Sequence, residues 1–179
     1  MGRYRRIIPL FRDTLSHGIV IAAQTPADAE RFRSLGANPA RTHVTGNIKF
    51  DFELPPEIAR RGRELRLEQA GDRPVWVAAS THDGEEEAAL DAHERVLMHH
   101  PAALLVLVPR HPERFPQVAA LLDARGISYV TRSSRAMATP STRVLLGDTM
   151  GELTTFYAAA DVAFVGGSLV RIGGHNLLE

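Results

Sequence analysis

Short apolar runs alternate with longer mixed segments along most of this chain. From residue 75 onward, the apolar runs lie at 75–79, 104–108, 128–130, 144–146 and 162–165. The segments 85–99, 118–125 and 151–160 lie between them and are predicted to be helices. The resulting order is strand, helix, strand, helix, strand, strand, helix, strand. This alternation predicts the α/β class with a doubly wound parallel sheet.

The run from Leu104 to Val108 says most about the layout of the predicted sheet. Its five residues are all aliphatic. Strands that alternate apolar and polar residues face water on one side, whereas a continuous aliphatic run is typical of a strand covered on both faces. We therefore predict that this strand lies in the centre of the sheet.

The first fifty residues predict a second, smaller group of elements. The run 19–22 is compact and apolar, which is typical of a buried strand, and 43–45 is a further candidate strand. Between them, Thr25 and Pro26 provide an N-cap and a first-turn proline for a helix predicted at 27–35.

Two other segments of this region lack one clear interpretation. Residues 3–17 place arginines among apolar residues, which fits a basic helix on a membrane surface. A helix on the outer face of a domain is the interpretation that we favour. Residues 50–56 carry few regular signals and are interpreted as a linker between domains, followed by a charged helix at 57–69.

Composition narrows the classes of function. The formal net charge is zero, so the overall charge does not favour nucleic acid as a partner. The chain has no cysteine, which excludes disulfides and cysteine-ligated zinc and fits a reducing compartment. No apolar run approaches the ~20 residues of a membrane span, and no signal-peptide core is visible, so we expect a soluble chain.

Polar residues follow four of the predicted strands, at the point where each strand ends. The four loops comprise 80–82, 110–111, 147–153 and 166–179. In open parallel sheets, ligands bind outside the carboxyl ends of the strands. Glycine turns that lead into helices present backbone N–H groups to anions, and an arginine adds a phosphate partner. We interpret this pattern as a nucleotide phosphate site.

Simpler interpretations of some of these residues stay open. The acidic triplet 85–87 is interpreted as helix-start electrostatics, with metal binding as the alternative. A zinc site from His82, His111 and His175 is not favoured, because no pair has the spacing of a known motif. Arg110 could also be a surface arginine without a ligand. Neither a complete GxGxxG nor a P-loop occurs.

Several motifs together resemble one family, the 3-deoxy-D-manno-octulosonic acid (Kdo) transferases of lipopolysaccharide assembly. They are GNIKFD at 46–51, ASTH at 79–82 with GEE at 84–86, PRHPERF at 109–115, GEL at 151–153, GGS at 166–168, and GGHN at 173–176 with Glu179. The resemblance runs from about residue 19 to the last residue. It implies a GT-B fold, in which two Rossmann-like domains face each other across a cleft.

The resemblance also implies partners and a location. The donor substrate would be CMP-Kdo, with no cofactor and no metal, and the acceptor a lipid A precursor. The intact protein would associate with the cytoplasmic face of the bacterial inner membrane. By the same resemblance, residues 1–52 would be the end of the N-terminal acceptor domain, and 53–179 an incomplete donor-binding C-terminal domain, so we expect a chain truncated at both ends.

Site residues are carried over motif by motif. The implied donor-binding residues are Ser80, Thr81, His82, Arg110, His111, Gly151, Glu152, Leu153, Ser168, Gly174, His175, Asn176 and Glu179. Among them, Arg110 and the amides of 151–153 would receive the CMP phosphate, and Asn176 and Glu179 would hold the phosphate–ribose end. Leu177 departs from the proline of many family members, a conservative packing change.

No catalytic residue is expected within this chain. In the family, the carboxylate that activates the acceptor belongs to an early stretch of the N-terminal domain without a counterpart in this sequence. An inverting transfer needs such a base, so we expect no turnover by the chain alone. Two alternatives stay open: another GT-B sugar-nucleotide enzyme, such as a UDP-sugar transferase or epimerase, and a non-catalytic nucleotide-binding remnant.

Overall fold

The computed structural model describes residues 12–15, 17–47 and 55–171. The chain divides into two compact units, one formed by residues up to Glu53 and the other beginning at Leu54.

The first unit contains a strand–helix–strand arrangement. It comprises β1 (Ile21–Ala23), α2 (Pro26–Ser34), the 3₁₀ turn η1 (Pro39–Arg41) and β2 (Thr42–Val44). The two strands pair in parallel, with Ile21 opposite Thr42. The predicted cap of the helix is confirmed, because Thr25 Oγ1 accepts a hydrogen bond from the Asp28 amide at 3.1 Å. The following proline occupies the first helical turn.

The prediction of a buried strand at 19–22 is wrong in part. The strand begins only at Ile21, and Val20 is 67% exposed. Within the strand, Ile21 and Ala23 are buried but the residue between them is exposed. Burial of every residue requires cover on both faces of the sheet. Among the described residues of this unit, α2 packs on the strands, and Leu15 of the helical residues 12–15 joins Ile21 in a small buried cluster. Of the predicted basic segment 3–17, residues 12–15 are helical, and most of the rest lies outside the described residues.

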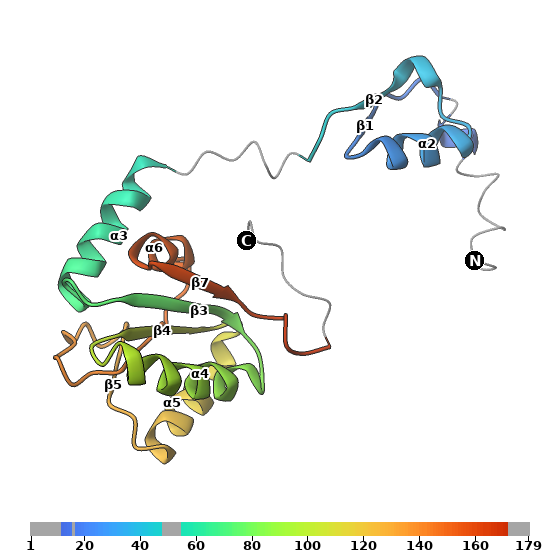
Figure 1. Cartoon of the computed structure of the whole chain (residues 1–179). Coiled ribbons are helices and arrows are strands. Elements are labelled where there is room, and N and C mark those ends of the chain that lie inside the picture. The colour runs from blue at the N-terminus through green and yellow to red at the C-terminus, as the bar shows by residue number, and fades with distance from the viewer. Residues whose placement is uncertain (1–11, 16, 48–54, 172–179) are drawn as a thin grey trace. The chain divides into compact units, whose positions relative to one another are not determined.

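The second unit is a five-stranded parallel sheet, and the predicted doubly wound sheet is confirmed. In chain order its elements are α3 (Pro56–Gln69), β3 (Val75–Thr81), α4 (Glu85–His99), β4 (Leu104–Pro109), the 3₁₀ turn η3 (Pro112–Arg114), α5 (Phe115–Ala124), β5 (Tyr129–Thr131), β6 (Val144–Leu146), α6 (Leu153–Ala159) and β7 (Val162–Val165) (Figure 1). The strands lie in the order β5-β6-β4-β3-β7, and every neighbouring pair is parallel.

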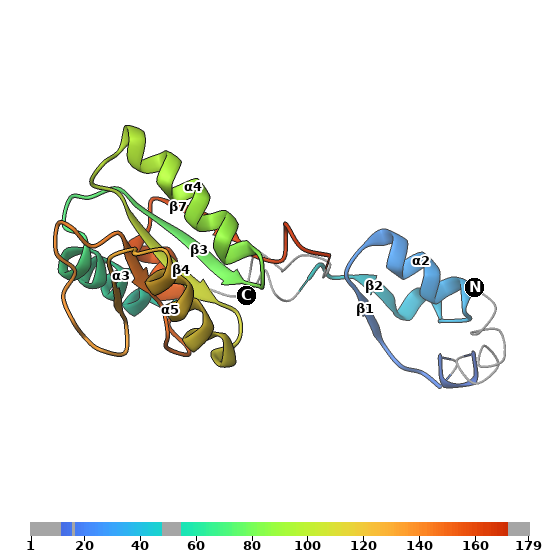
Figure 2. The same cartoon turned by 90° about the horizontal axis from the view of Figure 1, so that it is seen from below.

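Helices cover both faces of this sheet. Helices α4 and α5 lie on one face and α3 and α6 on the other, as the two views show (Figures 1 and 2). Strand β4 occupies the middle of the sheet, and all six of its residues are buried. The prediction of a central strand at Leu104–Val108 is therefore confirmed.

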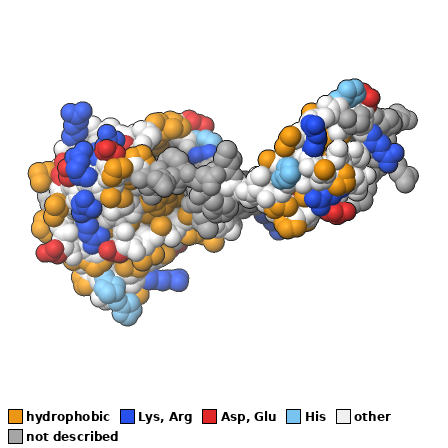
Figure 3. Space-filling view, turned by 90° about the horizontal axis from the view of Figure 1, so that it is seen from above, with side chains coloured by type: hydrophobic (Ala, Val, Ile, Leu, Met, Phe, Trp, Pro, Cys, Tyr) orange, Lys and Arg blue, Asp and Glu red, His pale blue; other side chains and the backbone are white. Residues whose placement is uncertain are grey.

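The surface of the second unit mixes charges of both signs. In the face shown by Figure 3, arginine side chains lie beside aspartate and glutamate side chains. On α3, for example, Arg60 and Glu64 form an ion pair at 2.6 Å. Within the described part of the chain, no helix combines the length and the apolarity that crossing a bilayer would require.

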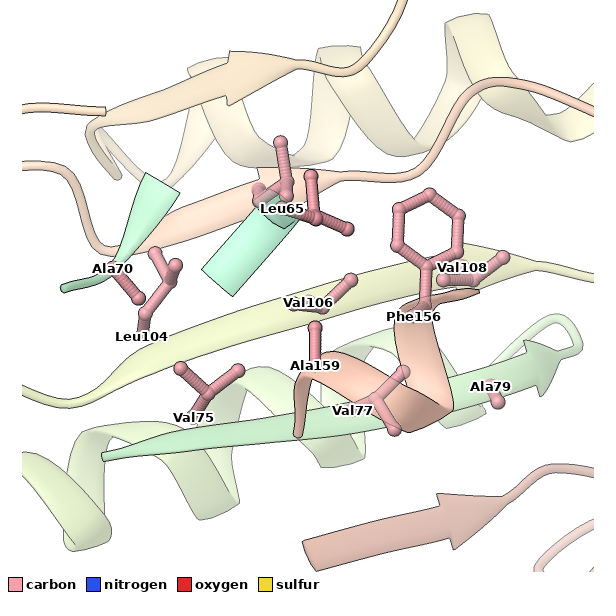
Figure 4. Close-up of a cluster of buried hydrophobic side chains, with 11 residues drawn as sticks. Leu65, Ala70, Val75, Val77, Ala79, Leu104, Val106, Val108, Phe156 and Ala159 are labelled. Carbon is pink, nitrogen blue, oxygen red and sulfur yellow. The ribbon is translucent and has the colours of Figure 1, made fainter. Parts of the chain in front are cut away.

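The core on the α3–α6 face is built by alternate residues of the central strands. Phe156 of α6 is fully buried and lies beside Val108 of β4 (Figure 4). The two helices of this layer also approach each other closely, because a Cβ atom at Gly62 would lie only 2.4 Å from the Ala158 Cβ. Real Cβ atoms do not come so close, so this packing requires a glycine at position 62.

Candidate functional site

The loops after β3, β4, β6 and β7 meet at one edge of the sheet, because these four strands are parallel neighbours. Hydrogen bonds link the loops to the adjacent strands. The Arg110 amide donates to the Thr81 carbonyl at 2.9 Å, and the Gly166 amide donates to the Ala79 carbonyl at 2.7 Å. The Gly147 amide likewise donates to β4 at 2.8 Å. The structure therefore brings together the described parts of the four loops that the sequence analysis selected.

A cavity of about 150 Å³ lies at this edge. Its lining residues are Ser80, Val108, Pro109, Arg110, Thr149, Met150, Gly151 and Leu153. Four of them are predicted donor-binding residues from three different loops: Ser80, Arg110, Gly151 and Leu153. Pockets for whole small molecules usually exceed ~300 Å³, so this cavity would hold only part of a nucleotide, such as a phosphate group.

Ser80 holds an unusual backbone conformation beside the cavity. Its φ angle is +54°, a region that non-glycine residues rarely adopt. The pairing between β3 and β4 is irregular between Ala79 and Thr81, so Ser80 occupies a bulge at the end of its strand. Such bulges re-aim side chains next to functional sites. Gly166 packs directly on this bulge, because a Cβ atom there would lie 2.2 Å from the Ser80 carbonyl oxygen.

The start of α6 forms another wall of the cavity. The amides of Thr155 and Phe156 donate to the Glu152 carbonyl, so the amides just before them belong to the first turn, which has no intrahelical acceptors. The Glu152 carboxylate turns to a different partner and binds Arg132 at 2.8 Å. This arginine, above all, holds the pKa of Glu152 below its ordinary value. At Glu152 the backbone amide, not the side chain, is thus the group suited to a phosphate.

The side chain of Thr81, a predicted donor-binding residue, points into the protein. Thr81 is fully buried, and its hydroxyl donates to the Glu86 carboxylate at 3.2 Å. Glu86 is also fully buried and binds Arg114 at 3.1 Å. The Thr81 hydroxyl is thus a hydrogen-bond partner of the buried Glu86 carboxylate, and this contact joins the end of β3 to the start of α4.

The side chains of His82 and His111 lie together at the same edge. Their ring centroids are 5.6 Å apart, and the rings meet edge to face. In residues 12–15, 17–47 and 55–171, no group of three or more histidine, cysteine or acidic side chains is placed to hold a metal ion. His175, the third histidine of the zinc alternative, lies outside the described residues, as do Gly174, Asn176 and Glu179.

The described part of the glycine turn after β7 has a carboxylate of the protein itself as a partner. The amide of Gly167 donates to the Glu85 carboxylate at 2.8 Å, and the amide of Leu169 donates to it at 2.9 Å. The hydroxyl of Ser168, a predicted donor contact, donates to the Val165 carbonyl at 2.8 Å, and this residue is exposed. Sequence reasoning favoured helix-start electrostatics for Glu85, and it did not predict this contact with the loop after β7.

The pKa of Glu85 reflects this environment. Burial raises it, but the hydrogen bonds from the amides of Gly167, Leu169, His82 and Ser168 outweigh burial, so the pKa lies below its ordinary value. The carboxylate is therefore ionised at neutral pH, although its side chain is fully buried.

A larger cavity, of about 380 Å³, lies near the opposite ends of the strands, where Arg73 and Ala102 precede β3 and β4. The polar side chains that line it are already used within the protein. Arg73 donates to the carbonyls of Ala102 and Thr139 at 2.6 and 3.1 Å, and Gln69 accepts from the Ala138 amide at 3.0 Å. These contacts hold the loop before β6 in place, so the smaller cavity is the better candidate site.

Comparisons with known proteins place the chain beside one group of transferases. A family model described as 3-Deoxy-D-manno-octulosonic-acid transferase (kdotransferase) matches residues 1–52. The 3-deoxy-D-manno-octulosonic acid transferase of Haemophilus influenzae is 45% identical over 177 residues, which are 99% of this chain and 42% of that protein. The Bordetella pertussis transferase is also 45% identical, over 89% of this chain and 37% of that protein. The chain thus spans less than half the length of these relatives.

A solved structure matches as well. The C-terminal CMP-Kdo binding domain of WaaA from Acinetobacter baumannii superposes with a TM-score of 0.63 at 37% sequence identity. The match covers 68% of this chain and 64% of that domain's chain. The resemblance inferred from the short motifs is therefore confirmed: the chain is related to the Kdo transferases over nearly its whole length, and it shares the fold of that domain from Acinetobacter baumannii.

Proposed function

We propose that this chain carries the donor site of an inverting Kdo transferase, an enzyme that moves Kdo from CMP-Kdo to a lipid A precursor in lipopolysaccharide biosynthesis. The observation that carries the proposal is the likeness to a CMP-Kdo binding domain at 37% identity. A cavity lined by Ser80, Arg110 and Gly151, at the edge of the sheet where α/β folds bind ligands, supports it.

The proposed roles follow from charge and position. Arg110 and the amides of residues 151–153 would receive the CMP phosphate at the cavity. When the bond between Kdo and the phosphate breaks, negative charge grows on CMP as the leaving group. A guanidinium and a helix N-terminus stabilise such charge, and they do so best when the protein fixes them in advance. Ser80, which also lines the cavity, would contact the donor there, and His82 and His111 would contact it from the adjoining loops.

For the intact enzyme, the proposed substrates and location are supported only by its relatives. CMP-Kdo would serve as a substrate, without a separate cofactor. A lipid A precursor is embedded in a membrane, so the intact protein would work at the cytoplasmic face of the bacterial inner membrane. The residues proposed for the phosphate–ribose end, Asn176 and Glu179, remain predictions.

Calorimetric titration with CMP tests the donor site. We expect binding to the wild-type chain, and we expect Arg110→Ala to weaken it roughly 10- to 100-fold, because a charge-assisted hydrogen bond contributes about 1.5–3 kcal/mol. Arg60→Ala is the matched control. Arg60 is exposed, as Arg110 is, and it lies on α3 and does not line the cavity, so CMP affinity should not change.

UMP separates this proposal from that of a UDP-sugar enzyme. We expect UMP to bind much more weakly than CMP to the wild-type chain. Equal binding of the two nucleotides would favour another sugar-nucleotide enzyme. A chain that is folded by circular dichroism and yet binds neither nucleotide would refute a donor site within these residues.

A further inference from the structure

A fully buried carboxylate connects two loops that flank the proposed donor site. Glu85 lies in the first turn of α4, and its carboxylate accepts hydrogen bonds from backbone amides of both loops. In the loop after β3, the His82 amide donates to it at 3.0 Å. In the loop after β7, the amides of Gly167 and Leu169 donate to it at 2.8 and 2.9 Å. The carboxylate thus bridges segments more than eighty residues apart.

These contacts are not ordinary helix-start electrostatics. A carboxylate that only complements the helix dipole can stay exposed and needs no particular partner. Glu85 instead has no exposed surface, and its partners on the β7 loop belong to a different part of the fold. A buried carboxylate without hydrogen bonds is strongly disfavoured, so its ionisation requires both loops to be in place.

The β7 loop in turn touches the wall of the cavity. Gly166 precedes the two bound amides and packs so tightly on the Ser80 carbonyl that a Cβ atom could not be accommodated. Ser80 lines the cavity and holds its strained backbone conformation there. A continuous set of contacts therefore runs from the Glu85 carboxylate through the turn at 166–169 to Ser80.

We propose that Glu85 is a positioning residue of the donor site: its carboxylate occupies the amides of the turn at 166–169 in place of a ligand anion and fixes that turn against Ser80. The inference rests on the proposed function. The amides of Gly167 and Leu169 are thus already occupied by an anion that belongs to the protein itself.

The test compares Glu85→Gln with Asp161→Asn in the 179-residue chain. Asp161 is a matched control at the other end of β7, where its carboxylate accepts from the Val75 amide at 2.8 Å and binds Arg66. Each substitution removes the charge of one carboxylate that links an end of β7 to another segment of the chain. We expect both variants to lose stability, but only Glu85→Gln to weaken CMP binding, by roughly tenfold or more, because small misplacements at a site have large effects.

The outcomes separate this inference from the proposed function. A folded wild-type chain that does not bind CMP refutes the donor site itself. A wild-type chain that binds CMP while Glu85→Gln binds it equally well overturns the positioning role alone. Equal weakening in both variants also overturns it, because loss of stability would then explain the effect.

If Glu85→Gln does not fold, amide hydrogen exchange in the wild-type chain still tests the inference. The amides of Gly167 and Leu169 should be protected, although Leu169 is 63% exposed, because Glu85 holds both of them. Exchange of these two amides at the rate of an unstructured peptide would overturn the inference.

Discussion

Replacing His93 by glutamine tests a buried polar contact between the sheet and α4. His93 is 3% exposed, and its Nδ1 accepts a hydrogen bond from Trp76 Nε1 at 3.0 Å. Its Nε2 lies 3.0 Å from the Arg143 carbonyl, to which it must donate. The ring is therefore neutral, with its proton on Nε2, because protonation of Nδ1 would break the contact with Trp76.

The same surroundings lower the pKa of His93 to about 4 from the ordinary value of 6.5. Burial is the main cause, the hydrogen bond to the Arg143 carbonyl opposes it, and the charges of Arg143 and Arg73 add to it. Between these two pKa values the unfolded chain binds a proton that the folded chain does not. The free energy of unfolding therefore falls as the pH is lowered through this window.

The size of the effect follows from the two pKa values. One pKa unit corresponds to about 1.4 kcal/mol, and the full effect is reached only below the folded pKa. Lowering the pH from 7 to 5 should therefore remove about 2 kcal/mol of stability through His93 alone. Glutamine retains one donor and one acceptor but does not titrate, so His93→Gln should lack this loss.

The assay is urea unfolding of both chains at pH 7, 6 and 5. Carboxylates titrate in both chains, so their contribution cancels when the two pH profiles are subtracted. His99→Gln, at an exposed position at the end of the same helix, serves as the control for replacing a histidine by glutamine. Equal losses in the wild-type chain and in His93→Gln between pH 7 and 5 would refute the reasoning.

Two substitutions test the packing of α3 and α6 on the sheet. Gly62→Ala should lower the free energy of unfolding by about 1–3 kcal/mol, because the new methyl group overlaps Ala158. An exposed helical glycine would show the opposite sign, and Arg63→Ala, an exposed neighbour, should have little effect. Phe156→Ala should cost about 3–5 kcal/mol in urea unfolding, because it empties a fully buried position. A loss below about 1 kcal/mol for Phe156→Ala would contradict the described core.

Local patterns predicted the second unit well, since its signals are strong and short-range. The aliphatic run at 104–108 placed the central strand, and the alternation of runs after residue 75 predicted the parallel sheet. The run at 19–22 misled for a physical reason. An apolar run shows that residues avoid water, but it does not show whether a second layer is present to cover them.

The sequence predicted which loops of the site lie together, but not the contacts that their buried side chains make. Parallel strands place their carboxyl ends at one edge, so Ser80, Arg110 and Gly151 could be brought together from the sequence. The buried position of Thr81 could not, because its partner Glu86 looks like one member of an acidic helix start. The bond between Glu85 and the turn at 166–169 is a long-range contact, and no local pattern encodes it.

The most direct test of the donor site is CMP titration of the ¹⁵N-labelled wild-type chain, followed through its amide chemical shifts. The account predicts saturable shifts that are largest at Ser80, Arg110 and Gly151, around the smaller cavity. UMP should produce much smaller shifts at the same concentration. Shifts centred instead on Arg73 and Thr139, around the larger cavity, or no shifts at all in a folded chain, would contradict it.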